Sequence, residues 1–488
     1  MDYERFLQEY SLKIDFEFAH DDQAAEWAEN GHRFWAQEDA ALEFEEDDPA
    51  VDERGDASSG ALSTDHRFLA ISTNAVIRIY DVQSKQILSV LKGHDQSVSR
   101  MYFAPQQDGD IDDEGSAKRY TLVSSGEHGV IKGQIIVWYL DVSGLPTGQS
   151  DIGSASPDVD SLADQAMTSV APGLTHQHGM ETEELGSLRD DMAETLRVAV
   201  FKHNTRKLPM LDAHLPAFGF DSPISSDGKR AVTLEKNQST QGGVRPLTDM
   251  PRIVVRNLSN LSEEWRLTGH QDGIMWAGFS PDGTRVAEAS WDQTYGIWDT
   301  GHNDRAEGHL IGPSGGQNWV GDFSADGKYI VFSGGRPTKV AVYEVETGNE
   351  VAQLNFNGIR DWVRRLKWSP IDYTIAVVVN HEVVLWHPLD GNTFTSVLKM
   401  YSDGTLLTDY NRLNLVQWVD EGQKLLVRDT ANNIYVWDIR MNKKWRFQRP
   451  DGMTCEYSPG EVFFSKRLAK EGALLGFDGD GKVRYWYL

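Results

Sequence analysis

A unit of about 45 residues recurs along this chain and limits what the chain can fold into. The unit is clearest over residues 269–299, with Gly-His at 269–270, Phe-Ser-Pro-Asp-Gly at 279–283 and Trp-Asp at 298–299. Partial copies occur on both sides of it, and each leads to an apolar stretch that usually closes on Trp or Tyr. Four strands with their turns occupy roughly this length, so the spacing indicates a repeated four-stranded unit.

Eight closing stretches can be aligned in this way. They end at Tyr80, Trp138, Arg256, Trp298, Tyr343, Trp386, Trp437 and Trp486. Period-two alternation of apolar residues and Asp-Gly turns indicate antiparallel hairpins, so we expect an all-β fold. The third unit closes on Arg-Asn instead of an aromatic residue, which leaves seven units as the alternative to eight.

The pattern from Gly-His to Trp-Asp resembles the WD-repeat β-propeller family. The resemblance covers residues 61–488 and implies a single propeller of eight, alternatively seven, four-stranded blades. More loosely, the whole chain resembles WD-repeat proteins of filamentous fungi, a likeness that implies no particular activity. We predict no second globular domain beyond the N-terminal arm and one insertion.

The first 60 residues form a separate, strongly acidic arm. They hold 19 acidic and four basic side chains, more than half of the chain's net charge. Ring closure in the resembled family usually pairs strands from the two termini, and residues 11–18 alternate between apolar and polar, so we expect the closing strand there. Helical spacing of Trp27, Phe34, Trp35 and Leu42 predicts a helix over residues 23–44, and residues 45–60 follow as an acidic linker.

Residues 142–205 form the largest of three insertions; the others are 106–118 and 236–252. The segment 144–173 is rich in Ser, Asp, Pro and Gly and is predicted to be disordered. Residues 181–203 carry one apolar stripe and are predicted to form an amphipathic helix. We expect the stripe to be a docking element, with Leu185, Leu188, Met192 and Leu196 as its contact residues.

Composition limits the classes of partner and of binding site that we expect for this chain. The formal charge of −27 argues against duplex nucleic acid, because phosphate binding needs clustered Lys and Arg. One cysteine, Cys455, permits neither an internal disulfide nor a multi-cysteine zinc site. The acidic N-terminus does not resemble a signal peptide or a mitochondrial presequence, and no apolar run is long enough for a membrane span. We therefore expect a cytoplasmic or nuclear protein with protein partners, no membrane contact and no cofactor or metal.

His270, Ser290, Asp292 and Trp298 include the residue types of a hydrolase triad. We favour a structural interpretation. WD repeats use the corresponding residues as a hydrogen-bonded chain from Asp to His to Ser to the indole N–H, which satisfies all their polar groups within one blade. The acidic run at 108–114 lacks the sixth-position Gly and twelfth-position acid of a calcium loop, so it does not indicate a metal site.

Aromatic and cationic residues recur where the inner strands begin. Trp276, Trp319 and Trp362 occupy this place in three successive units, and Arg360, Arg364 and Arg365 surround the last of them. Loops at this place line one mouth of a propeller channel, and Trp and Arg often dominate interface energies. We therefore regard these six residues as a candidate protein-binding face. The alternative is that the Trp rings pack between blades.

These features favour a non-enzymatic scaffold or adaptor that is itself monomeric within an intracellular protein complex. One alternative is that the acidic arm binds a basic client, as in histone-binding or ribosome-associated members of the family. A hydrolase site in the channel is a third hypothesis, which we disfavour because WD-type propellers are seldom catalytic.

Overall fold

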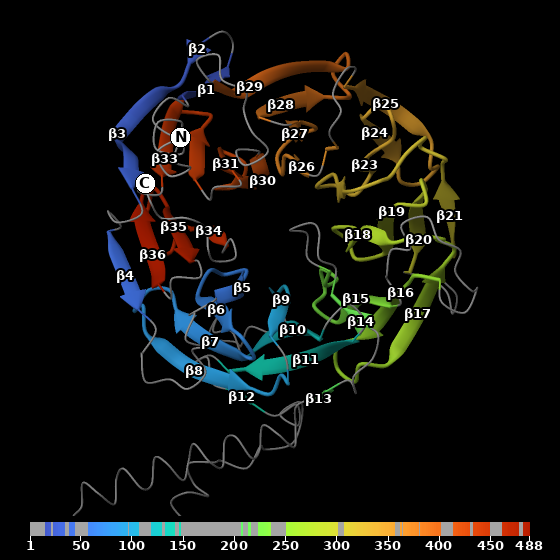
Figure 1. Cartoon of the computed structure of the whole chain (residues 1–488), viewed down its shortest axis with the longest axis horizontal. Coiled ribbons are helices and arrows are strands. Elements are labelled where there is room, and N and C mark those ends of the chain that lie inside the picture. The colour runs from blue at the N-terminus through green and yellow to red at the C-terminus, as the bar shows by residue number, and fades with distance from the viewer. Residues whose placement is uncertain are drawn as a thin grey trace, which may run out of the picture.

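Strands of the eight repeat units form eight β-sheets that are arranged as blades around a central axis (Figure 1). The structure is a computed structural model, and it describes residues 15–20, 23–34, 39–43, 57–95, 97–106, 119–128, 132–141, 146–147, 206–207, 213–215, 223–235, 250–300, 307–356, 362–363, 365–379, 381–401, 413–429, 433–448, 461–477 and 482–488. The expected β-propeller is confirmed, with eight blades instead of seven. No helix occurs among the described residues, and none of them therefore forms a helix that could cross a membrane.

The first four blades follow the chain in order from inner to outer strand. Their strands are β5 (Ala57–Leu62), β6 (Phe68–Thr73), β7 (Val76–Asp81) and β8 (Ile87–Lys92); β9 (Val98–Phe103), β10 (Tyr120–His128), β11 (Lys132–Leu140), β12 (Pro146–Thr147) and β13 (Arg206–Lys207); β14 (Ala213–His214), β15 (Arg230–Glu235), β16 (Arg252–Asn257) and β17 (Glu263–Thr268); and β18 (Ile274–Phe279), β19 (Arg285–Ser290), β20 (Tyr295–Asp299) and β21 (Glu307–Ile311). In blade two, β12 and β13 both pair with β11, so its outer position is divided between two short strands.

The last four blades are completed by the N-terminal segment. Their own strands are β22 (Gly321–Phe323), β23 (Tyr329–Gly334), β24 (Lys339–Glu344) and β25 (Glu350–Asn355); β26 (Arg365–Trp368), β27 (Ile375–Val379), β28 (Glu382–His387) and β29 (Thr393–Tyr401); β30 (Leu413–Val419), β31 (Lys424–Asp429), β32 (Ile434–Asp438) and β33 (Lys443–Gln448); and β34 (Val462–Ser465), β35 (Ala473–Phe477) and β36 (Lys482–Tyr487). The N-terminal strands are β1 (Asp15–His20), β2 (Gln23–Ala24), β3 (Glu26–Phe34) and β4 (Ala40–Glu43).

The helix predicted over residues 23–44 is wrong, because this segment is β2, β3 and β4. Strand β3 runs parallel to β33 as a fifth strand of blade seven, and β4 supplies the missing outer strand of blade eight (Figure 1). The open backbone groups of β33 and β36 accept these strands, which a local periodicity argument cannot detect.

Ring closure is therefore made by β4 and not by the predicted strand at residues 11–18. The described part of that prediction falls in β1, which pairs with β29 as an extra strand of blade six. Phe18 of β1 is fully buried and stacks on Trp437 of blade seven, with ring centroids 5.4 Å apart. The N-terminal segment thus follows the outside of blades six, seven and eight.

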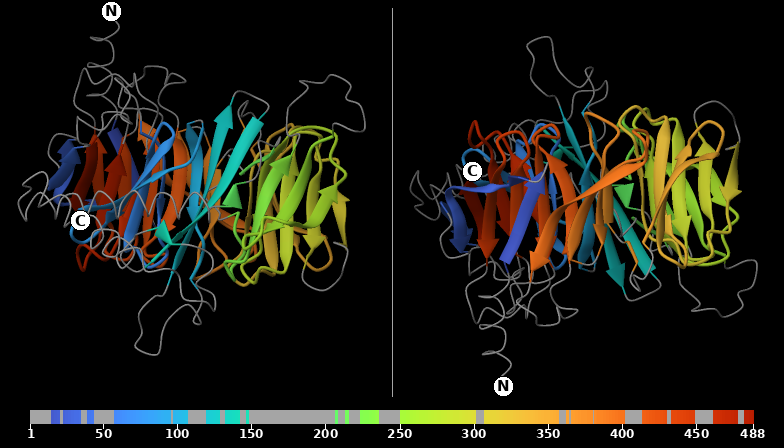
Figure 2. Two further views of the ribbon diagram at one scale, coloured as in Figure 1. Left: turned by 90° about the horizontal axis from the view of Figure 1, so that it is seen from below. Right: turned by 90° about the horizontal axis from the view of Figure 1, so that it is seen from above.

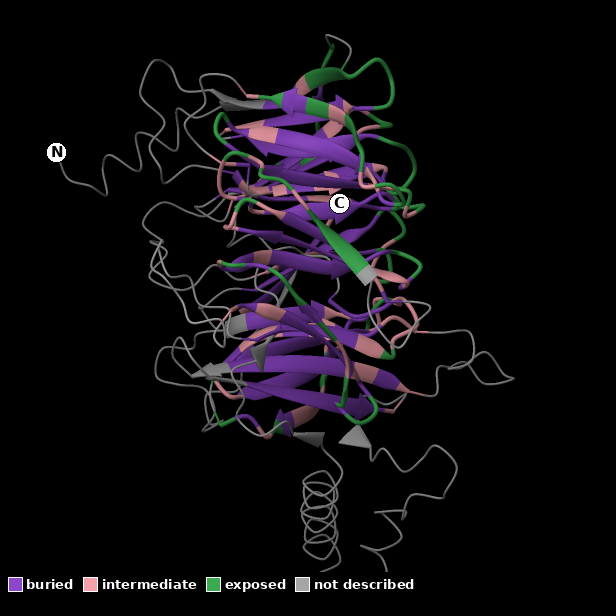
Figure 3. Cartoon of the chain, turned by 90° about the vertical axis from the view of Figure 1, so that its right-hand side faces the viewer, coloured by how far each residue is buried: buried purple, intermediate pink, exposed green. Residues whose placement is uncertain are grey.

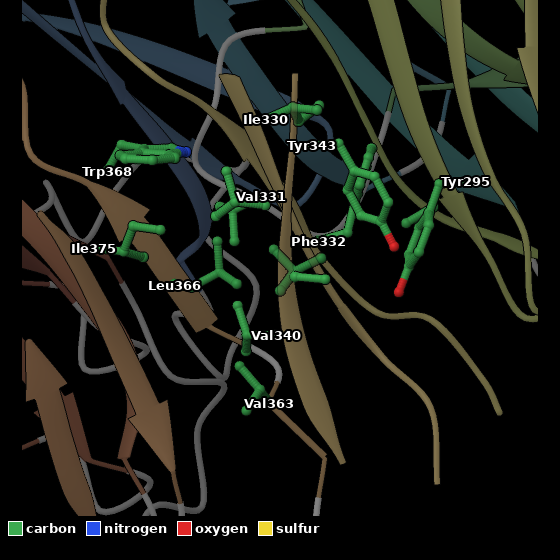
Figure 4. Packing of buried hydrophobic residues seen from close by; sticks show 14 of the residues in the cluster. Tyr295, Ile330, Val331, Phe332, Val340, Tyr343, Val363, Leu366, Trp368 and Ile375 are labelled. Carbon is green, nitrogen blue, oxygen red and sulfur yellow. The ribbon is translucent and has the colours of Figure 1, made fainter. Parts of the chain in front are cut away.

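The core lies between adjacent blades (Figure 3). Second and third strands of each blade are buried along most of their length, whereas outer strands such as β25 are largely exposed. Between blades four and five, Tyr295 stacks on Phe332 at 4.3 Å between ring centroids, and the same cluster continues to Leu366 and Trp368 of blade six (Figure 4). Because both faces of each middle sheet are covered, these strands are nearly continuous apolar runs.

Consecutive strands of a blade are antiparallel and run between the two faces of the ring (Figure 2). The loops that lead into the inner strands and the turns between second and third strands therefore lie together on one face. We call this the top face, and the opposite one the bottom face. The predicted helix at 181–203, with Leu185, Leu188, Met192 and Leu196, lies outside the described residues.

Candidate protein-binding face

Three tryptophan rings form a row on the top face of blades four to six. Trp291 lies in the turn after β19, Trp319 lies just before β22, and Trp362 lies just before β26. The Trp291 and Trp319 rings meet edge to face at 5.2 Å, and those of Trp319 and Trp362 are tilted at 5.4 Å between centroids. All three side chains are half-buried, so the row keeps apolar surface in contact with solvent. We call Trp291, Trp319 and Trp362 the tryptophan row.

An arginine covers one end of this row. Arg336, in the turn between β23 and β24, places its guanidinium 5.5 Å from the centroid of the Trp362 ring. Its side chain is exposed and forms no hydrogen bond or ion pair with any part of the described chain. A guanidinium that stacks on an aromatic face keeps its N–H donors at its edge available.

Buried polar contacts fix the middle of the row. Asn318 is fully buried and donates from Nδ2 to the Thr294 carbonyl at 3.0 Å, while the Ser314 hydroxyl donates to its Oδ1 at 2.6 Å. The next residue, Trp319, donates its backbone N–H to the Ser333 carbonyl at 3.2 Å. Because these bonds join blades four and five, the Trp319 ring is held in place before any ligand arrives.

A second polar network holds the turn that carries Trp291. His270 Nδ1 lies 2.9 Å from Asp292 Oδ2, and the Thr294 hydroxyl donates to Asp292 Oδ1 at 2.6 Å. The Gln271 backbone N–H also donates to Asp292, at 2.8 Å. The network therefore ties the loop before β18 to the turn between β19 and β20.

The link from His270 to Trp298 is made by Glu288 and not by Ser290. Glu288 Oε1 lies 3.2 Å from His270 Nε2 and accepts the Trp298 indole N–H at 2.6 Å. Ser290 instead donates to the Asp272 carbonyl at 2.9 Å and accepts the Asp292 N–H at 3.1 Å. The predicted role of Ser290 is corrected accordingly, because the residue in line with both rings lies two positions earlier on β19.

Blade two has the His–Ser–Trp part of the arrangement that the sequence predicted for blade four. There the Ser124 hydroxyl lies 2.7 Å from His94 Nε2 and accepts the Trp138 indole N–H at 2.6 Å. Ser124 on β10 therefore occupies the position that Glu288 occupies on β19. Sequence reasoning missed this serine because the insertion at 106–118 separates β9 and the loop before it from β10, which carries Ser124.

The replacement of Ser by Glu changes the charge of the network. Burial alone would lower the pKa of His270, but the carboxylates of Glu288 and Asp292 raise it to about 10. Burial would raise the pKa of Asp292, yet the bond to His270 and its charge, with the Thr294 hydroxyl, lower it to about 2. His270 is therefore an imidazolium held between two carboxylates at neutral pH.

This geometry does not provide a hydrolase triad. A nucleophilic serine must be within hydrogen-bond reach of its base, but Ser290 bonds to backbone groups and to neither nitrogen of His270. Both His270 nitrogens face carboxylates and the imidazolium has no proton-accepting lone pair. Within the described ranges, no group of three or more His, Cys, Asp or Glu side chains is placed to hold a metal ion.

The other predicted face residues are distributed differently. Trp276 is only 1% exposed and packs against Phe332 between blades, so it belongs to the core. Arg365 lies on β26 and donates from Nε to the Asn414 carbonyl at 2.6 Å. Arg360 and Arg364 lie outside the described residues.

Two residues of this face, Trp291 and Arg336, were not predicted from the sequence. The position of Trp291 directly before Asp292 in a turn is a signal that could have found it.

Comparison with known proteins gives no matching family model. The chain is similar to the small ribosomal subunit protein RACK1 of Drosophila melanogaster, with 24% identity over 176 residues. The matched residues are 36% of this chain and 54% of that relative, so the chain spans about half the length of the curated relative that it matches.

Solved structures match over a longer stretch. Sqt1 of Saccharomyces cerevisiae covers 90% of this chain and 97% of its own, with a TM-score of 0.53 and 8% identity. Sqt1 of Chaetomium thermophilum bound to the N-terminus of the ribosomal protein L10 covers 90% of this chain and 98% of its own, with a TM-score of 0.52 and 12% identity. At such identities the likeness is one of fold.

Proposed function

The chain is a WD-repeat β-propeller, and from this premise we propose that it acts as a non-enzymatic scaffold that binds a protein partner through its top face. The observation that carries the proposal is the tryptophan row, which presents three half-buried rings side by side on a rigid surface. We place this scaffold in the cytoplasm or the nucleus, as a monomer within a larger complex.

The energetics of interfaces support this choice of surface. Trp and Arg are enriched among residues whose truncation costs most binding energy, and such residues gather in well-packed, pre-formed pockets. Trp291 and Trp319 are pre-positioned because Asn318 and the His270–Asp292 network fix the loops that carry them. A partner that covers the rings gains apolar burial without paying to order these loops.

The contacts of Ser290 and His270 also support a binding role in preference to a hydrolytic one. Their polar atoms are used within the blade, and the network holds a loop in place. The proposal therefore assigns His270, Glu288, Asp292 and Trp298 a structural role that maintains the top face. Ser290 contributes to the same turn through its backbone contacts.

Affinity purification of the full chain followed by mass spectrometry tests the proposal. Proteins captured by the wild type should be lost with Trp319→Ala, the variant at the centre of the row. Trp27→Ala is the matched control, because Trp27 is 41% exposed on β3, away from the top face. Thermal denaturation must show that both variants are folded. Equal capture by the wild type and a folded Trp319→Ala variant would contradict the proposal.

A basic client is the second candidate, favoured by the charge of −27 and by the ribosomal context of the similar proteins. In this case the client would be attracted by the acidic charge of the chain as a whole. The described part of the N-terminal arm is paired with blades six to eight, so the arm is less available for such a role than expected. Capture that falls steeply between low and moderate salt, and is unaffected by Trp319→Ala, would favour this candidate.

A further inference from the structure

Arg336 has no acidic partner among the described residues, unlike several other arginines of the ring. Arg252 and Arg256 pair with Glu235, Arg266 pairs with Glu263, and Arg285 pairs with Glu346. Arg336 only stacks on Trp362, and its edge is exposed to solvent beside the tryptophan row. In a chain with 74 acidic side chains, this arginine stands beside apolar surface without an acid to pair with.

We propose that the tryptophan row and Arg336 bind an extended acidic peptide segment of the partner. A carboxylate of Asp or Glu lies at the edge of Arg336, and neighbouring apolar side chains lie on the rings of Trp362 and Trp319. This inference rests on the proposed binding function of the top face and names the chemistry of the partner.

Geometry favours a carboxylate at this position. A guanidinium offers two parallel N–H donors that match a planar carboxylate, and that of Arg336 lies over the Trp362 ring, 5.5 Å from its centroid. Charge-assisted hydrogen bonds of this kind are about twice as strong as neutral ones. A phosphate site is typically built from a cluster of arginines, whereas here Arg336 lies over Trp362 and Arg365 nearby is bonded to the Asn414 carbonyl.

The charges near the two ends of the tryptophan row also determine which end takes the acidic part of the bound peptide. Asp272 lies in the loop before β18, at the Trp291 end, and its Oδ1 accepts the Gly273 N–H at 2.7 Å. Asp292 is paired with His270 at the same end. An acidic residue is thus attracted by Arg336 at the Trp362 end and repelled by Asp272 at the Trp291 end, so the acidic side of the segment faces blades five and six.

A random dodecapeptide library displayed on phage provides the probe, with the immobilised full chain as the target. The selected peptides should carry Asp or Glu next to Pro, Leu or an aromatic residue. The best peptide is then synthesised with each acidic residue changed to its amide, and binding is measured by fluorescence anisotropy. We expect one such change to weaken binding about tenfold or more, as loss of a charge-assisted hydrogen bond does.

Protein variants locate the contact. Arg336→Gln should weaken the acidic peptide about tenfold and leave its amide version unchanged. Arg440→Gln is the matched control, because Arg440 is also exposed but follows β32 on the bottom face. Binding of the acidic peptide that is equal in the wild type and Arg336→Gln would overturn the proposal. The same holds if the library yields no peptide above background, or if a phosphoserine version binds more than tenfold tighter than the carboxylate peptide.

The Trp319 and Arg336 variants distinguish a failure of the acidic-segment proposal from a failure of the proposed binding function of the top face. If protein capture depends on Trp319 but Arg336→Gln changes neither capture nor peptide binding, the acidic segment is wrong and the top-face function stands. If Trp319→Ala leaves capture intact, the function itself fails.

Discussion

Glu288 and Gly296 lie opposite each other on β19 and β20, and the absent side chain of Gly296 leaves the space that the Glu288 carboxylate occupies. A Cβ atom at Gly296 would clash with Glu288 and would lie 2.7 Å from Trp298 Nε1. In blade two the matching pair is Ser124 opposite Ile136, a small residue opposite a large one. In blade four the large residue is on the second strand and the small one on the third, the reverse of blade two, and this leaves room for the Glu288 carboxylate.

Gly296→Ala should therefore destabilise the protein by about 1–3 kcal/mol, the usual cost of overpacking a buried site. The Ser124 arrangement suggests the compensating change. In a Glu288→Ser background, the cost of Gly296→Ala should fall by about 1 kcal/mol or more, because the clash is removed. Urea denaturation of the four proteins gives this coupling energy, and additive effects would show that the two residues do not share the space.

His270 should remain protonated at pH 8, where an ordinary imidazole with a pKa of about 6.5 is neutral. The carboxylates of Glu288 and Asp292, acting against burial, raise its folded-state pKa to about 10. Carbon-13 NMR of the histidine-labelled chain, assigned with His270→Gln, measures this directly. A His270 signal with neutral-imidazole shifts at pH 8 would contradict the assignment of charge.

The same network predicts how stability changes with pH. Because the pKa of His270 is raised in the folded protein, its protonation stabilises the fold fully below pH 6.5. This contribution is lost as the pH rises through about 10. The pKa of Asp292 is lowered to about 2, so its ionised carboxylate stabilises the fold above pH 3.8, the ordinary pKa. This contribution is lost as the pH falls toward 2. The difference in melting temperature between the wild type and His270→Gln should therefore be largest between pH 4 and 6.5 and should narrow toward pH 10. A constant difference would exclude this linkage.

Phe18 anchors β1 to the ring. It is 0% exposed and stacks on Trp437, with 16° between the ring planes. Phe18→Ala should cost about 3–5 kcal/mol, as for other buried phenylalanines. Phe394→Ala is the control, since Phe394 is 58% exposed on β29 and its loss should change stability by less than about 0.5 kcal/mol. Guanidinium denaturation compares the two, and equal small effects would mean that β1 is not part of the cooperative fold.

Truncation tests ring closure by β4. Removal of residues 1–43 leaves the edge of β36 without its partner, and open edges of this kind promote association. We expect this variant to aggregate or to melt at a lower temperature, whereas removal of residues 1–14 retains all four N-terminal strands. Size-exclusion chromatography and thermal melts distinguish them. A monomeric variant lacking 1–43 with unchanged melting temperature would show that β4 is dispensable.

The sequence predicted the features that depend on local pattern. All eight closing stretches are third strands of blades, because an apolar run that ends in an aromatic residue fits a strand covered on both sides. Prediction from the sequence failed where the strand that a segment pairs with is distant in the chain. The apolar residues between 23 and 44 have helical spacing, but the backbone of this segment is paired with strands about 400 residues away, and pairing overrides local propensity.

Burial of individual tryptophans depends on one or two positions of register. Trp276 is the third residue of β18 and points into the core, whereas Trp319 and Trp362 precede their strands and reach the top face. Similarly, Ser290 and Glu288 share one side of β19, but only the Glu288 carboxylate accepts a hydrogen bond from the Trp298 indole N–H. A sequence pattern places such residues on the right strand and does not fix which of them meets its partner.

The path of the N-terminal segment has a consequence for the protein during its synthesis. Strands β1, β3 and β4 leave the ribosome first, yet their partners β29, β33 and β36 are translated last. At 5–20 residues per second, β1 waits roughly 20 to 75 seconds for β29 to appear. During this interval a nascent chain carries unpaired strands and a Phe18 side chain that nothing yet covers. Chaperone binding to the early chain, released only when the last blade emerges, is the expected cost of a ring that its first residues close.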